Sequence, residues 1–145
     1  MKTRKITLSL LVVLAVVLSA AVAAAGDFDW TKDLDIRAEA DPEGFRARLS
    51  ARFNIGNAQI QVVLGNVDRP ADAYMVFRLG EMSSVPVDYV LERYKADGKR
   101  GWGVLAKSLG IKPGSREFQA LKEGGDLFGK AAKGNVDRKK GARGK

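Results

Sequence analysis

The sequence predicts an all-α protein: a compact bundle of about six short helices, with an extended arm before it and a disordered basic tail after it. Three observations support this fold class. Between residues 41 and 125 apolar residues recur at helical spacing, glycine and proline separate these stretches at short intervals, and no second segment alternates clearly with a period of two. Short helices that each bury one face, joined by tight turns, form a single packed domain.

Residues 1–25 have the composition of a secretory signal peptide. Lys2, Arg4 and Lys5 precede a long apolar stretch, and its alanine-rich end places Ala23 and Ala25 where signal peptidase recognises small side chains. The apolar stretch, at about 20 residues, is also long enough for an uncleaved membrane anchor. The cleavage motif favours the signal peptide, so we expect a periplasmic or secreted protein.

Cleavage after Ala25 is testable directly. The intact mass of the protein from the envelope fraction should correspond to a chain that begins at Gly26. Recovery from the membrane of a chain that still begins at Met1 would contradict the prediction.

Residues 26–40 predict an extended arm laid across the helices. Apolar residues occupy mostly even positions there, whereas charged residues occupy mostly odd ones, and a period of two is typical of extended backbone. The even apolar positions are Phe28, Trp30, Leu34, Ile36, Ala38 and Ala40.

The first three helices are predicted from the residues at which they begin. Asp41 can cap a helix over residues 42–54, with Pro42 at its first position. Asn57 can cap the second, although β-branched residues there leave a strand open. Pro70 begins the third, which is apolar nearly all round and is therefore expected to be the central helix.

The last three helices are predicted from the residues at their boundaries. A fourth begins at Ser84 and ends at Asp97, and a fifth ends at Gly110, where Ile111 can fold back on the last turn. Ser115 caps a sixth, which ends at the glycine pair of residues 124–125. The helical domain is thus expected over residues 41–125, and the tail over residues 126–145.

The net charge of +8 resides mostly in the tail. Residues 26–128 are close to neutral, whereas residues 129–145 carry seven cations against one acid and have one sizeable apolar side chain. Such a segment cannot bury enough surface to order itself, and it favours contact with polyanions. The predicted polyanion-binding residues are Lys130, Lys133, Arg138, Lys139, Lys140, Arg143 and Lys145.

The chain contains neither cysteine nor histidine. Disulfides, the usual zinc sites, cysteine nucleophiles, Ser-His-Asp triads and imidazole bases are therefore excluded. Four aspartates at positions 27, 29, 33 and 35 suggest a calcium site or a hydrolytic pair, but the glycine turn and spaced glutamate of a calcium loop are missing. We read them as a solvated face, and we expect no catalytic residue, metal or cofactor.

Residues 101–118 form the most distinctive motif. They resemble a group of small, uncharacterised exported bacterial proteins that share the pattern G-W-G-x-x-A-K-x-L-G-I-K-P-G-S-x-E-F and typically end in a Gly/Lys-rich tail. The likeness covers roughly residues 70–122 and implies export, but no activity. The signature residues singled out here are Trp102, Ala106, Lys107, Leu109, Gly110, Pro113, Gly114 and Phe118.

The same motif is similar to the first helix and turn of a helix-turn-helix. Arg116 stands where the recognition helix of that motif needs an apolar residue, which makes sequence-specific DNA binding a remote alternative. Trp102 shares its helical spacing with Leu105 and Leu109, which predicts a core residue, although its flanking glycines would also suit a ring that meets a ligand.

These patterns together predict an exported envelope binding or accessory protein without catalytic activity. Its tail would contact an acidic polymer such as lipopolysaccharide, anionic lipid or extracellular nucleic acid. The alternative is an enzyme that uses only Asp and Glu on envelope glycans, which needs two carboxylates about 5 to 9.5 Å apart across a cleft. The sequence leaves the ligand, the pathway and the oligomeric state open.

Overall fold

The computed structural model describes residues 26–128 and is all-helical there, which confirms the predicted fold class. The predictions for residues 1–25 and 129–145, including all seven predicted polyanion-binding cations, lie outside the described residues. Seven α-helices and a short 3₁₀ helix make up the described part: α2 (Trp30–Ala40), α3 (Pro42–Phe53), α4 (Asn57–Leu64), α5 (Pro70–Ser83), α6 (Val87–Asp97), η1 (Gly98–Arg100), α7 (Trp102–Ser108) and α8 (Arg116–Glu123).

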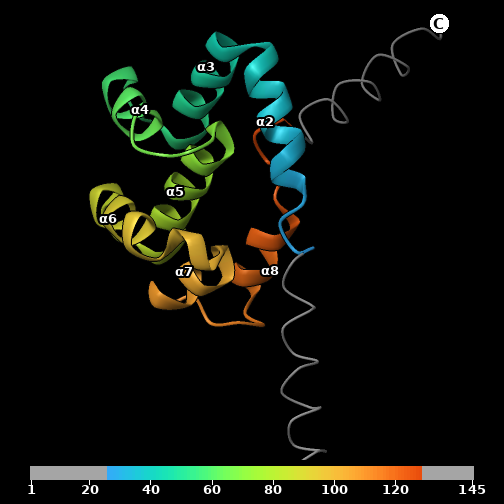
Figure 1. Ribbon diagram of the computed structural model, residues 1–145, viewed down its shortest axis with the longest axis vertical. Coiled ribbons are helices and arrows are strands. Elements are labelled where there is room, and N and C mark those ends of the chain that lie inside the picture. Colours follow the sequence, from blue (N-terminus) through green and yellow to red (C-terminus); the bar gives the residue numbers. More distant parts are fainter. Residues whose placement is uncertain (1–25, 129–145) are drawn as a thin grey trace, which may run out of the picture.

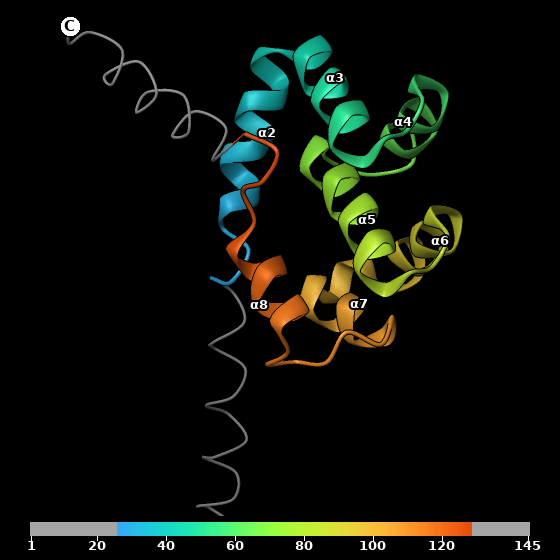
Figure 2. The same ribbon diagram turned by 180° about the vertical axis from the view of Figure 1, so that it is seen from behind.

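Helix α5 is the centre of the fold, as its apolar sequence predicts. The other helices follow one another around it, and α2, α4 and α6 contact it directly (Figures 1 and 2). Nine of its residues are buried, among them Tyr74, Met75 and Val76 at 1% exposure or less. This one helix supplies seven of the 21 buried apolar residues among the described residues, so it forms the middle of the core.

Several predicted helix ends are confirmed. Asp41 accepts a hydrogen bond from the Gly44 amide at 2.9 Å, and Ser115 accepts one from the Phe118 amide at 3.2 Å. Gly110 takes a positive φ of 86°, after which the Ile111 amide donates to the Ala106 carbonyl at 3.0 Å. These three helix ends are thus satisfied by residues close in sequence.

The prediction of an extended arm over residues 26–40 is wrong, because residues Trp30–Ala40 form helix α2. The apolar residues at positions 30, 34 and 38 are spaced by four, which satisfies both a period of two and a helical period. Burial settles the choice: Thr31, Leu34 and Ala38 face the core, whereas Ile36 is 65% exposed.

The predicted starts of two helices are also wrong. Ser84 does not begin a helix but ends α5 in the left-handed conformation, with φ 57°, and α6 begins at Val87 after Pro86. A proline disfavours helical backbone in the residue before it, which explains the delayed start. Gly56, in extended backbone, is the N-cap of α4, and Asn57 is its first helical residue.

Residues 126–128 pack on the helices, so the packed fold extends beyond the predicted domain boundary at residue 125. Residues 124–128, here called the strap, return along α2 (Figure 2). Leu127 is 7% exposed, and the Asp126 carboxylate accepts hydrogen bonds from Arg52 Nε at 2.7 Å and from the Tyr74 hydroxyl. Burial alone raises the pKa of Asp126, but these hydrogen bonds outweigh it and hold that pKa below its ordinary value.

Helices long and apolar enough to cross a bilayer do not occur among residues 26–128.

Candidate functional site

The signature residues divide into two groups in the structure. Ala106 and Leu109 are buried in the core at 0% and 9% exposure, and Gly110 and Gly114 take positive φ angles in the connection from α7 to α8. The other four line a surface groove: Trp102, Lys107, Pro113 and Phe118. The motif therefore folds its own segment and also forms one wall of a candidate site.

This groove, here called the Trp102 groove, has a volume of about 650 Å³. It brings together segments that are far apart in the sequence: residues 27–29, Thr31, Lys32, Arg69, η1, α7, Pro113 and Phe118. Its position follows from the closing of the fold, where α8 meets the start of α2 and Lys122 pairs with Asp27 at 3.1 Å.

Trp102 provides the aromatic surface of the groove. Its ring stacks on Tyr94, with centroids 5.5 Å apart and planes 21° apart, and it is half-buried rather than enclosed. The prediction that Trp102 is a core residue is therefore only partly right, whereas that for Leu109 is confirmed. Val104, also in the groove, is 43% exposed.

A second cavity of about 480 Å³ adjoins the groove, since Arg69, Lys99 and Trp102 line both. Its floor is a hydrogen-bond network. The Tyr94 hydroxyl donates to Asp72 Oδ2 at 2.9 Å, and Arg69 contacts Asp72 at 3.0 Å and Asp35 at 3.3 Å. This network fixes the tyrosine that supports the Trp102 ring.

The network also sets protonation states. Burial raises the pKa of Tyr94 to about 12, and its hydrogen bond to Asp72 adds to this effect, although a bond from the Asp68 amide opposes it. Burial also raises the pKa of Asp35, against a hydrogen bond from the Ala71 amide and the charge of Arg69. Tyr94 therefore remains a neutral hydroxyl at physiological pH.

Cations outnumber acids around the Trp102 groove. Two acids, Asp27 and Asp29, face five cations: Lys32, Arg69, Lys99, Arg100 and Lys107. Lys32 pairs with Asp29 at 3.1 Å and Arg100 lies 3.6 Å from Asp97. Over residues 26–128, Lys99 and Lys107 have no carboxylate within 4.0 Å, so their charges remain available to a ligand.

The two acids of the groove, Asp27 and Asp29, each pair with a lysine at 3.1 Å. Across the described residues no three Asp or Glu side chains gather into a metal site. What the arrangement can do is bind an anionic group through its cations while a flat or apolar part of the same ligand lies on the Trp102 ring.

Of the predicted similarity to a helix-turn-helix, the structure retains only two successive helices. The connection between α7 and α8 spans residues 109–115, whereas the motif joins its helices by about 3 to 4 residues. The recognition geometry of that motif therefore does not follow from this segment.

Sequence reasoning missed four cations of the groove: Lys32, Arg69, Lys99 and Arg100. The pair at residues 99–100, directly before Gly101 and Trp102, is the one local signal that could have revealed them. The other two reach the groove only through the fold.

Comparison with known proteins gives no relative: neither family models, curated proteins nor solved structures match the chain.

Proposed function

We propose that this chain is an exported, non-catalytic binding protein of the cell envelope that holds an acidic polymer or anionic lipid headgroup in the Trp102 groove. One observation carries the proposal: a half-buried tryptophan, stacked on Tyr94, lies among five cations, of which Lys99 and Lys107 have no carboxylate partner in the described structure. Exposed cations beside an aromatic face favour anionic groups attached to a flat or apolar body.

The signal peptide and the basic tail support the envelope setting. An exported protein meets acidic polymers at the cell surface, and a cationic segment binds polyanions through the release of counterions. In this proposal the groove orients one anionic unit of the polymer, and residues 129–145 add contacts along it.

The groove is tested by the double substitution Lys99→Gln/Lys107→Gln. Removing two exposed charges should lower affinity for lipopolysaccharide and for phosphatidylglycerol vesicles about tenfold at low salt, since each contact contributes about 0.7 kcal/mol. Both side chains are exposed, so the melting temperature should not change. Binding is measured by titration of the Trp fluorescence.

The matched control is Lys112→Gln/Arg116→Gln. It removes the same net charge from exposed positions that line neither the Trp102 groove nor the adjoining cavity. We expect less than about a twofold change in affinity, consistent with long-range screening. If the two double variants lose affinity equally, the protein binds by net charge alone and the groove has no special role.

The tail is tested separately by deleting residues 129–145. If the tail contacts about five phosphates of a single-stranded DNA, the slope of log affinity against log salt concentration should be near −3.5. Deletion of the tail should remove most of this salt dependence. The melting temperature should stay the same, because the deleted segment has one sizeable apolar side chain and is predicted from its composition to bury little surface. A truncated chain that binds as tightly would leave the tail as a solubilising segment without a partner.

A further inference from the structure

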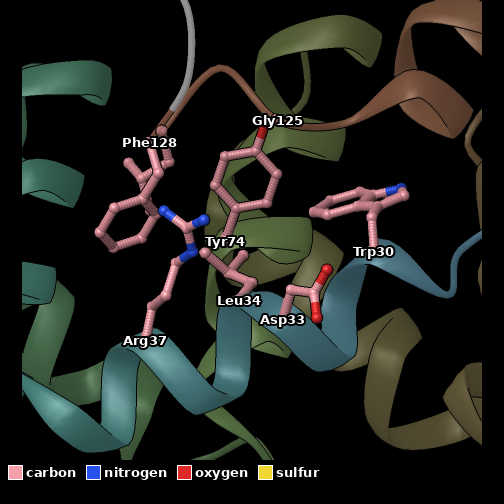
Figure 3. A pocket seen from close by; sticks show the side chains of 8 residues that line it. Trp30, Asp33, Leu34, Arg37, Tyr74, Gly125 and Phe128 are labelled. Atoms are coloured by element: carbon pink, nitrogen blue, oxygen red, sulfur yellow. The ribbon is translucent and has the colours of Figure 1, made fainter. Parts of the chain in front are cut away.

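A separate cavity lies beneath the strap, on the side of the fold where α2 faces α5 (Figure 3). It measures about 200 Å³, and the residues that line it include Trp30, Asp33, Leu34, Arg37, Tyr74 and Phe128. A cavity of about 150 Å³ suffices for benzene. The space is therefore large enough for one aromatic ring or branched aliphatic group with a few more atoms.

The walls of this cavity are apolar and held in place. The Trp30 ring meets Tyr74 edge-on, with centroids 5.6 Å apart and planes at 89°. Two guanidinium groups contact Phe128, with Arg37 Cζ 5.3 Å and Arg48 Cζ 4.8 Å from its ring centroid. The Tyr74 hydroxyl is tied to Asp126 of the strap, so its ring is fixed against the cavity.

Two opposite charges stand at the mouth. Asp33 and Arg37 are exposed, lie one turn apart on α2, and rise toward the strap on the same side of the helix (Figure 3). Residues at this spacing commonly pair with each other. Here their charged groups are more than 4.0 Å apart, and neither pairs with another charge among residues 26–128.

We propose that the cavity binds a free amino acid with an aromatic or branched apolar side chain. The side chain fills the space between Trp30, Leu34 and Tyr74. The carboxylate pairs with Arg37 and the ammonium with Asp33, which matches the two unpaired charges with the two charges of a zwitterion. A simple apolar acid would leave Asp33 facing an anion, and a simple amine would leave Arg37 facing a cation.

The experiment is calorimetric titration of the purified protein with L-phenylalanine and L-leucine. Phenylpropionate, which lacks the ammonium, and phenethylamine, which lacks the carboxylate, serve as analogues. We expect saturable binding of at least one amino acid, and affinities about tenfold weaker for the analogues, because each lacks one charge-assisted hydrogen bond. No saturation by either amino acid up to about 10 mM, or an analogue that binds as tightly, would overturn the proposal.

Arg37→Gln provides a specific variant, and Arg48→Gln its matched control. Both arginines cover Phe128, but only Arg37 lines the cavity. Arg37→Gln should weaken binding of the amino acid and of phenylpropionate about tenfold and leave phenethylamine unchanged. Arg48→Gln should change none of the three, and equal effects of the two variants would contradict the assignment.

This site does not depend on the Trp102 groove. The two share no lining residue, so Lys99→Gln/Lys107→Gln should leave amino-acid binding unchanged. Each proposal can therefore fail without the other.

Discussion

Replacing Gly124 by alanine is expected to lower the free energy of unfolding by about 3 kcal/mol. The residue has φ 54° and ψ −157°, a conformation that side chains with a Cβ rarely adopt, at a cost of about 1–3 kcal/mol. A Cβ there would also lie 2.2 Å from Cε2 of the Trp30 ring. Relief of that overlap requires the strap or Trp30 to shift, at a further cost of about 1–3 kcal/mol.

Gly114→Ala is the matched control for this prediction. Gly114 also has a positive φ, of 84°, but a Cβ there meets nothing within 4 Å. It should therefore show only the conformational cost, of about 1 kcal/mol. Urea denaturation of the two variants measures the difference. Equal losses would mean that the strap does not press on Trp30 as the structure shows.

Features encoded within a few residues were predictable from the sequence. The caps at Asp41 and Ser115 and the turn at Gly110 depend on neighbours three to five positions away, and the structure confirms all three. The central place of α5 was also predictable, because a helix that is apolar on every face has to be buried.

Features decided by distant contacts were not predictable. The pattern at residues 30, 34 and 38 fits strand and helix alike, and the fold selects the helix by packing α2 on α5, where Asp35 accepts a hydrogen bond from the Ala71 amide at 2.7 Å. The position of the strap also depends on distant contacts, because Asp126 accepts hydrogen bonds from Arg52 and Tyr74, which lie more than 50 positions away in the sequence. Loop residues without periodicity carry no sign of such partners.

The candidate site likewise has a part that the local sequence predicted and a part that only the fold brings together. The motif at residues 101–118 identified one wall of the Trp102 groove, because unusual local sequence marks unusual local structure. Lys32 and Arg69 complete it from other helix starts, and only the fold brings them there. Sequence spacing also overstated the burial of Trp102, because position on a helix face does not show where the core ends.

Replacing Asp72 by alanine should destabilise the fold by about 2–4 kcal/mol. Its side chain is 5% exposed and accepts hydrogen bonds from Arg69 and from the Tyr94 hydroxyl. Loss of the carboxylate leaves both donors without this acceptor in a place that water reaches poorly. The cost stays below that of a fully buried pair, because Arg69 is 45% exposed and can turn to solvent.

Asp88→Ala is the control for Asp72→Ala. Both aspartates lie in the first turn of a helix, α5 and α6 respectively, but Asp88 is exposed. The control should lose only the favourable interaction with the helix dipole, about 0.5 kcal/mol. Denaturant unfolding at pH 7 compares the two, and a loss below about 0.5 kcal/mol for Asp72→Ala would contradict the network.

Alkaline pH gives a second measure of the same network. The pKa of Tyr94 is about 12 in the folded protein, against 10.0 for an unperturbed tyrosine, so the unfolded chain releases this proton first. A shift of two pKa units corresponds to about 2.7 kcal/mol, and solvent screening of the half-buried side chain reduces this value. Tyr94 therefore makes the free energy of unfolding fall by about 1–2 kcal/mol as pH rises from about 10 to about 12. In Asp72→Ala this contribution should shrink, because the hydrogen bond and negative charge that help to raise the pKa are gone. It should not vanish, because burial, the larger cause, remains. An unchanged alkaline slope in the variant would show that Asp72 does not hold the Tyr94 hydroxyl.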